Sequence, residues 1–195
     1  MGQPVRVVLT GRSRSRKHDG SPFGGKVMKR CVVFLLVGLA FASAASAGRF
    51  GVGLGVSLYK PAEEGASYTP LFSANGYYWV DKHWVPSLEV GYSRYVIEDT
   101  TYNYVPVIPR VTYHFALTKN FDPYAGLGLV YARKWWDGAL EGDKNTWGFA
   151  ASMGINVAAS DNFGLGLGVE YVVPDAGDFD SAYPSFRLSL GAGGF

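Results

Sequence analysis

Apolar and small residues alternate along most of the chain beyond residue 49. In the clearest stretch, 50–58, every second residue is large and apolar, and the residues between are glycine or serine. A period of two is typical of β-strands, because successive side chains point to opposite faces. A stretch over 71–80 is less regular, and we predict a strand there without assigning its phase. The same alternation recurs clearly in the stretches 84–93, 105–115, 124–132, 148–157, 163–171 and 185–191.

The segments between these eight predicted strands alternate in length. Eight antiparallel strands of about ten residues, with short turns at one end and longer loops at the other, are typical of a bacterial outer-membrane barrel. An even number of strands places both ends of the barrel on the short-turn side, which we expect to face the periplasm. Short turns are predicted near 81–83, 118–120 and 160–162, and longer loops near 60–67, 97–103, 136–145 and 174–181.

Alternation alone does not distinguish a membrane barrel from a soluble barrel whose apolar face points inward. The second face favours the membrane barrel, because it carries mainly Gly, Ser and Ala, which fit the narrow interior of eight strands. Aromatic residues near strand ends fit the two girdles of a membrane barrel. The sequence therefore predicts an all-β fold, an eight-stranded antiparallel up-and-down transmembrane β-barrel. We expect Trp84, Phe115, Phe121 and Phe163 at the periplasmic rim, and Tyr92, Tyr131, Trp147 and Tyr171 toward the outer rim.

Two segments and the last residue carry a family resemblance. VPVIPRVTYHF at 105–115, DPYAGLGLVYA at 122–132 and a final phenylalanine resemble the small outer-membrane barrel proteins of OmpA/OmpX type and their opacity-protein-like relatives. The resemblance implies a plugged interior and an aromatic last residue, Phe195, that is read by the barrel assembly machinery. Phe195 falls out of phase with the apolar residues of its own strand, and a β-bulge at Gly193-Gly194 would restore the phase.

A secretory signal peptide is predicted over 28–47. It has a basic start, a short apolar stretch and an Ala-x-Ala ending, and cleavage is expected between Ala47 and Gly48. A membrane anchor is the alternative, but the apolar run is shorter than the ~20 residues that a spanning helix needs. We interpret the basic residues 1–27 as a mis-assigned N-terminal extension, read from an upstream start codon; a nucleic-acid-binding arm is the alternative. The predicted barrel domain is then 48–195.

The charge of the full chain misleads about its partners. Its 18 Lys and Arg and 16 Asp and Glu give a net charge of +2 and a pI near 8.6, which by itself suggests nucleic acid or an anionic surface. Eight of the basic residues and one acid precede residue 48, so the predicted barrel has a net charge of −5. Nucleic acid is therefore not an expected partner. The single cysteine, Cys31, argues against a disulfide scaffold and against a cysteine-rich zinc module.

Four ionisable residues fall on the inward face, well inside strands: Glu89, Arg110, Glu170 and Arg187. Charges in a narrow lumen are tolerable only when they are paired and hydrogen-bonded. Each hairpin is expected to place its own Glu directly across from its own Arg, and closure of the barrel allows a network of all four. The network is either a gate, opened by exchange of ion-pair partners, or a permanent plug, which the narrow bore favours.

The remaining candidates have simpler explanations. His114 faces inward near the short turns with no inward serine beside it, which fits a polar plug residue better than the acid/base of a lipid-modifying enzyme. Asp175, Asp178 and Asp180 lack the spacing of an EF-hand and fit a solvated acidic loop. No metal site and no cofactor are expected.

Arg94 and Arg133 are predicted to point outward at the loop ends of their strands, where they would meet lipopolysaccharide phosphates. We predict an exported integral protein of the bacterial outer membrane, not an enzyme, that stabilises the envelope or presents its loops to surfaces. Its expected partners are outer-membrane lipid, lipopolysaccharide and the barrel assembly machinery. Two alternatives remain, a narrow channel for ions or small solutes and a lipid-modifying barrel enzyme.

Overall fold

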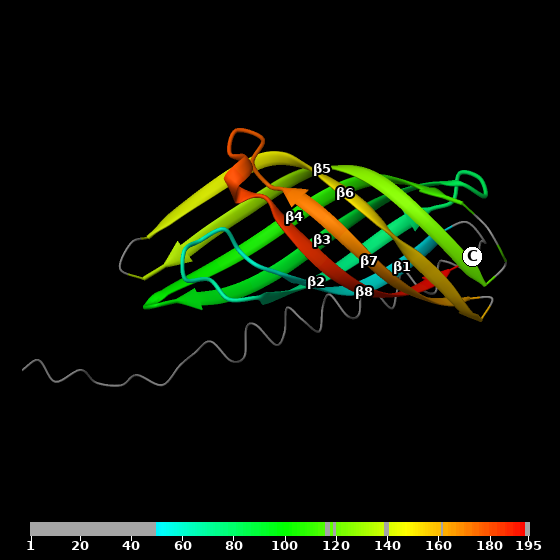
Figure 1. Ribbon diagram of the computed structural model, residues 1–195, viewed down its shortest axis with the longest axis horizontal. Helices are drawn as coiled ribbons and strands as arrows, with labels where there is room; N and C mark the ends of the chain where they lie inside the picture. The colour runs from blue at the N-terminus through cyan, green and yellow to red at the C-terminus, as the bar shows by residue number, and fades with distance from the viewer. Residues whose placement is uncertain (1–49, 116–117, 119, 139–140, 161, 194–195) are drawn as a thin grey trace, which may run out of the picture. The chain divides into compact units, whose positions relative to one another are not determined.

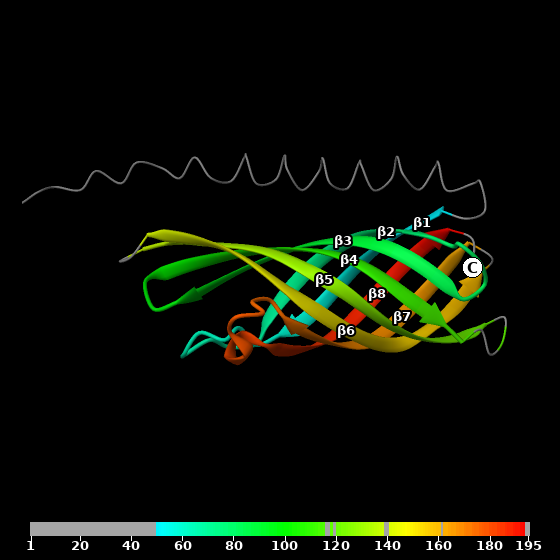
Figure 2. The same ribbon diagram turned by 90° about the horizontal axis from the view of Figure 1, so that it is seen from above.

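The computed structural model describes residues 50–193, apart from 116–117, 119, 139–140 and 161. These residues form a closed barrel in which every strand pairs antiparallel with its sequence neighbours and β1 pairs with β8 (Figures 1 and 2). The predicted fold class is confirmed. The elements are β1 (Phe50–Tyr59), β2 (Thr69–Tyr78), β3 (Trp84–Ile97), β4 (Thr100–His114), β5 (Phe121–Asp137), β6 (Gly142–Ser160), β7 (Phe163–Val173), the short 3-10 helix η2 (Phe179–Ser181) and β8 (Tyr183–Gly193).

The large apolar side chains point out of the barrel, as the alternation predicts. Leu127, Met153 and Phe186 are 71%, 62% and 65% exposed. Apolar surface of this extent is unfavourable in water, whereas the hydrocarbon of a bilayer solvates it. Strand β2, whose phase the sequence left open, points Phe72 outward and Ser73 inward. Because the barrel has no edge, the backbone groups of the strands are paired within the sheet, as a bilayer requires.

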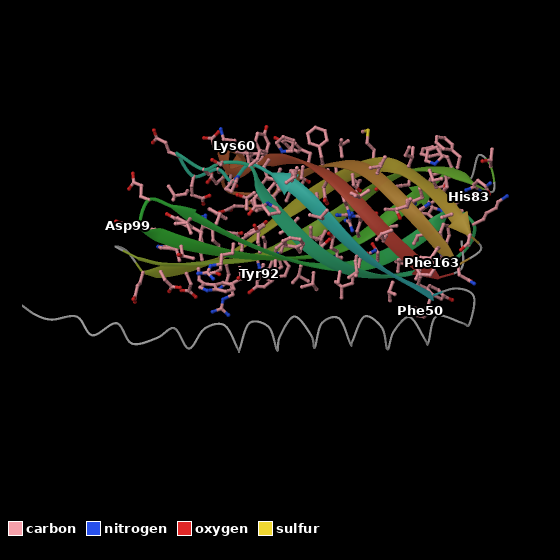
Figure 3. All side chains as sticks on the ribbon, turned by 90° about the horizontal axis from the view of Figure 1, so that it is seen from below. Phe50, Lys60, His83, Tyr92, Asp99 and Phe163 are labelled. Carbon is pink, nitrogen blue, oxygen red and sulfur yellow. The ribbon has the colours of Figure 1, made fainter. Side chains whose placement is uncertain are left out.

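The expected rim residues are on the outside of the barrel. Figure 3 shows Phe50, His83 and Phe163 at one end of the barrel, Lys60 and Asp99 at the other, and Tyr92 between them. We call the first the turn end and the second the loop end. The rim residues, all exposed except the half-buried Tyr131, are Trp84, Phe115, Phe121, Phe163, Tyr92, Tyr131, Trp147 and Tyr171.

Strands β3 to β6 are longer than the alternation predicted, with 14, 15, 17 and 19 residues. The long loops expected at 97–103 and 136–145 are therefore wrong: Ile97 pairs with Thr100, and Trp136 pairs with Gly142. The first turn is tight because Glu98 adopts a φ of +50°, the left-handed conformation that two-residue hairpin turns use. The extra residues find cross-strand partners, so β3–β6 project past the loop ends of their neighbours (Figures 1 and 2).

The other connections agree with the expectation. Segments 60–68 and 174–182 are the two long loops, and short turns join the strands at the turn end. In one of these turns the Asp81 carboxylate accepts the backbone N–H groups of His83 and Trp84 at 2.7 and 2.8 Å. Among the described residues, no helix has the length and apolar character to span a membrane. The predicted signal peptide, its cleavage site at Ala47 and Gly48, and Phe195 lie outside the described residues.

Candidate functional site

The lumen holds a cluster of four buried charges, which we call the ion-pair cluster. Glu89 lies on β3, Arg110 on β4, Glu170 on β7 and Arg187 on β8, and each is between 4% and 8% exposed. Arg110 donates to Glu170 and Arg187 donates to Glu89, both as short charge-assisted hydrogen bonds. Arg110 Nη2 also lies 3.5 Å from Glu89 Oε2. The cluster is therefore one connected and electrically neutral network.

The pairing inside the cluster differs from the expected one. Arg110 stands directly opposite Ser87, and Arg187 opposite Gly168, so each hairpin places its Glu and Arg two residues apart along the strand. The two short hydrogen bonds instead cross the lumen between the β3–β4 and β7–β8 hairpins. Among the described residues there is no direct Glu170–Arg187 ion pair. The expectation of direct cross-strand pairs is therefore wrong.

Glycines lie close to both arginine side chains of the cluster. A Cβ on Gly55 would lie 3.2 Å from Arg187 Nε, and a Cβ on Gly128 would lie 3.3 Å from Arg110 Cβ. The small inward residues predicted from the alternation thus serve a packing purpose, because the interior of an eight-stranded barrel is only just wide enough for side chains to fill.

The lumen on the loop-end side of the cluster is closed by tyrosines, a feature that the sequence reasoning missed. The rings of Tyr59, Tyr104 and Tyr183 lie 4.6 to 6.4 Å apart, and the hydroxyls of Tyr104 and Tyr183 are 3.0 Å apart. All three are at most 5% exposed. The sequence did carry a signal for these tyrosines, because they occupy inward positions that elsewhere in the barrel hold small residues. Together with Leu71, Ile108, Val130, Ala132, Ala150 and Val172 they form the tyrosine plug.

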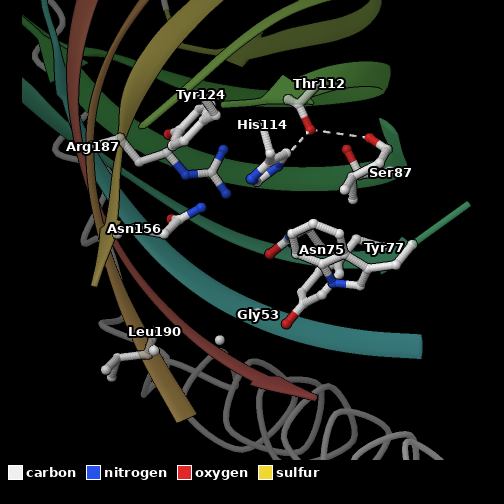
Figure 4. A pocket seen from close by; sticks show the side chains of 15 residues that line it. Gly53, Asn75, Tyr77, Ser87, Thr112, His114, Tyr124, Asn156, Arg187 and Leu190 are labelled. Atoms are coloured by element: carbon white, nitrogen blue, oxygen red, sulfur yellow. Dashed lines mark hydrogen bonds between the residues drawn. The ribbon is translucent and has the colours of Figure 1, made fainter. Parts of the chain in front are cut away.

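The lumen on the turn-end side of the cluster contains a cavity of about 100 Å³, lined by both polar and apolar residues (Figure 4). Asn75, Asn156 and Arg187 are among its lining residues. The volume is well below the roughly 300 Å³ at which pockets for small-molecule ligands begin. The cavity therefore fits ions or solvent better than an organic substrate.

His114 lies in this cavity within a chain of polar contacts. Its Nδ1 is 2.5 Å from Asp122 Oδ2, and its Nε2 is 3.1 Å from Thr112 Oγ1. The order Thr–His–Asp resembles that of a hydrolase triad. However, the Thr112 hydroxyl donates to the carbonyl oxygen of Val85 at 3.1 Å, so its proton is engaged away from the imidazole. The arrangement therefore fits a hydrogen-bonded lining of the lumen, close to the polar plug role expected of His114.

Arg94 and Arg133 lie on one outward face of the extended strands, which we call the outer patch. Arg94 pairs with Asn103, and Asn103 with Trp135, so these residues form one row across three strands. Arg133 stands in the row below and is 3.7 Å from Asp143. Both arginines are exposed. The outer patch starts directly above the girdle pair Tyr131 and Trp147, whose rings are 4.8 Å apart.

In the acidic loop 174–182, the carboxylate of Asp175 makes two hydrogen bonds with described residues. Asp175 accepts from Lys144 Nζ at 2.8 Å and from the Gly177 N–H at 3.0 Å. These hydrogen bonds hold the pKa of Asp175 below its usual value. Within the described residues, no group of three or more His, Cys, Asp or Glu is arranged to hold a metal ion.

Comparisons with known proteins agree with this geometry. Residues 31–192 match the family model described as the outer membrane protein beta-barrel domain, so the chain belongs to that family. It is an outer-membrane β-barrel protein, located in the bacterial outer membrane. No match was found among curated proteins.

Solved structures with the same fold come from several bacteria. Neisserial surface protein A has a TM-score of 0.61 and 18% identity over 73% of this chain and 94% of its own. The attachment invasion locus protein Ail of Yersinia pestis has a TM-score of 0.56 and 16% identity over 74% of this chain and 97% of its own. The N-terminal barrel domain of Pseudomonas aeruginosa OprF has a TM-score of 0.56 and 14% identity over 74% of this chain and 98% of its own. At these identities the likeness concerns the fold.

Proposed function

We propose that the protein is a plugged, non-conducting barrel that stabilises the outer membrane and presents its extended β3–β6 strands at the cell surface. The observation that carries this proposal is the filling of the lumen at two successive levels. The ion-pair cluster fills one level with four charged side chains, and the tyrosine plug fills the next with buried aromatic and aliphatic groups. An ion would have to break buried ion pairs and then cross an apolar layer, both of which are costly.

Conductance across a planar bilayer tests the proposal against the channel alternative. The protein should insert without producing conductance steps. A triple variant with Arg110→Ala, Tyr104→Ala and Tyr183→Ala should produce them, because it removes filling side chains from both the ion-pair cluster and the tyrosine plug. Heat-modifiable migration in gels checks that each variant has folded. Regular conductance steps from the unaltered protein would refute the plug and favour the narrow channel.

We propose lipopolysaccharide as the lipid partner of the outer patch. Two exposed arginines just above an aromatic girdle offer the donors that the phosphates of this lipid would use. The guanidinium of Arg133 is already partly neutralised by Asp143, so Arg94 should contribute more. A basic residue near an anionic membrane surface contributes about 1 kcal/mol.

Unfolding temperatures in vesicles with and without lipopolysaccharide test this contact. Lipopolysaccharide should raise the unfolding temperature of the unaltered protein, and Arg94→Gln should lose more of this increase than Arg133→Gln. Lys60→Gln is the matched control, because Lys60 is an exposed cation at the same end but away from the outer patch. Equal losses in all three variants would show that only general charge matters.

We propose that the protein is not an enzyme. The Thr112 hydroxyl, which contacts His114, donates to a backbone carbonyl, and the cavity beside it is too small for a lipid chain. Mass analysis of lipid A from cells with and without the protein should show the same species. A species that depends on the protein and disappears in His114→Ala would overturn this proposal.

A further inference from the structure

Two lysines stand directly opposite each other on the inward face of the extended strands. Lys134 on β5 and Lys144 on β6 are register partners, and Lys134 also stands opposite Tyr104 of the tyrosine plug. Like charges directly opposite each other on a sheet are destabilising. This pair therefore needs negative partners, and the two long loops of the barrel supply them.

Each lysine receives a carboxylate from a different loop. Glu63, in segment 60–68, forms a short ion pair with Lys134, and Asp175, in segment 174–182, lies 2.8 Å from Lys144. Segment 60–68 joins β1 and β2, and β5 lies four strands away from β1 and three strands away from β2 in the eight-stranded closed barrel. The Glu63–Lys134 contact therefore reaches across the mouth of the barrel.

Further contacts hold segment 60–68 in that position. The Tyr95 hydroxyl donates to Glu63 Oε2 at 2.8 Å, so the carboxylate is held by two elements. The backbone N–H of Ala66 donates to the carbonyl oxygen of Glu63 at 3.0 Å, and Ala66 is only 8% exposed. A loop that buries a residue and inserts a carboxylate among partners is packed against the barrel rather than extended into solvent.

We propose that segment 60–68 is a cap over the loop end of the lumen, latched through Glu63 to Lys134, with Asp175 neutralising the second lysine of the pair. The cap goes beyond the proposed plugged barrel, because it is a third closure that lies outside the tyrosine plug. It also sets what the cell surface presents, since an open cap would expose Lys134 and Tyr95.

The ion pair between Glu63 and Lys134 is formed at neutral pH. Burial raises the pKa of Glu63, but the hydrogen bonds and charge of Lys134 and the hydrogen bond of Tyr95 lower it more, so this pKa lies below its usual value. Among the described residues, the hydroxyls of Tyr59 and Tyr104 also interact with Glu63 and are neutral in this range, and Glu64 is its neighbour in the chain. A depressed carboxyl pKa stabilises the closed cap above about pH 4.3, and this stabilisation is lost as pH falls through the folded pKa.

Maleimide labelling of a cysteine at position 66 tests the cap. In the full chain carrying Cys31→Ser and Ala66→Cys, labelling at pH 7 should be slow. Adding Glu63→Gln or Lys134→Met should speed labelling about tenfold or more, as expected for the loss of a charge-assisted hydrogen bond. Glu64→Gln is the matched control, an exposed acid one residue away that should leave the rate unchanged.

A charge exchange makes the test specific. Glu63→Lys combined with Lys134→Glu should restore slow labelling, whereas either change alone should not. A cysteine at position 66 that reacts as fast as one at the exposed position 67, or a rate that Glu63→Gln leaves unchanged, would overturn the cap. Because the tyrosine plug remains in every variant, none of them should conduct, so failure of the cap is distinguishable from failure of the plug.

Discussion

At the scale of single residues, the ion-pair cluster shows how charge is tolerated in a narrow lumen. Arg110 contacts both carboxylates, so it connects the two hairpins. Arginine suits this position because its planar fork keeps its charge and donates in several directions. Loss of Arg110 would leave Glu170 buried without the group that donates to it, whereas Glu89 would still have Arg187.

Arg110→Ala should therefore destabilise the barrel by about 3–5 kcal/mol, the usual cost of removing one partner from a buried ion pair. Arg110→Met combined with Glu170→Gln should cost less, because both charges leave together. Urea unfolding of the protein refolded in detergent measures both values. If the single and double variants unfold at the same urea concentration, the cluster does not behave as an ion-pair network.

At the scale of elements, the extended strands are the feature that departs most from the sequence prediction. Residues 97–103 and 136–145 contain turn-forming and charged residues, which suggested loops. In the barrel these residues extend the β3–β4 and β5–β6 hairpins. The two extended hairpins also pair with each other through β4 and β5, where Thr101 stands opposite Asp137. Tyr95 and Tyr102 stack face to face at 5.2 Å, which adds a cross-strand contact. Neighbouring strands thus decide strand length, which a local pattern cannot reveal.

Replacing residues 96–101 by Asn-Gly should shorten the β3–β4 hairpin without unfolding the barrel. The removed residues lie beyond the tyrosine plug and Tyr95, and Asn-Gly forms the two-residue turn that hairpins prefer. The shortened protein should keep its heat-modifiable migration in gels. A matched two-residue replacement of 86–91, within the lipid-facing part of β3, should abolish it. Loss of folding in the first variant would show that the extension is part of the folding core.

At the scale of the whole molecule, charge is distributed unevenly. The loop-end segments 60–68, 94–103, 133–145 and 174–182 contain ten acids and five bases. The net charge of −5 predicted for residues 48–195 is therefore located at this end, while the ion-pair cluster is neutral. The basic outer patch is a local exception on an acidic end, which favours contact with lipid phosphates beside the barrel over capture of polyanions from solution.

Assembly of the whole barrel gives a prediction about Phe195. Gly193, the first residue of the pair where we predicted a bulge, has a φ of +143°, a conformation that favours glycine. If the last residue is read by the assembly machinery, Phe195→Ala should reduce the amount of protein inserted in the outer membrane of cells. Phe186→Ala, a lipid-facing phenylalanine of the same strand, is the control and should insert normally. Equal insertion of both variants would contradict the assembly role.

The sequence by itself determined the number and order of the strands, the inward and outward faces of all of them except β2, and the four lumen charges. Each of these follows from the period of two, because alternation assigns a side chain to a face before any strand has a partner. The tertiary structure alone decided which Arg meets which Glu, that three tyrosines from β1, β4 and β8 meet, and that Glu63 reaches Lys134. Such contacts depend on strand register and on the distance across a closed lumen, and only closure of the sheet sets these quantities.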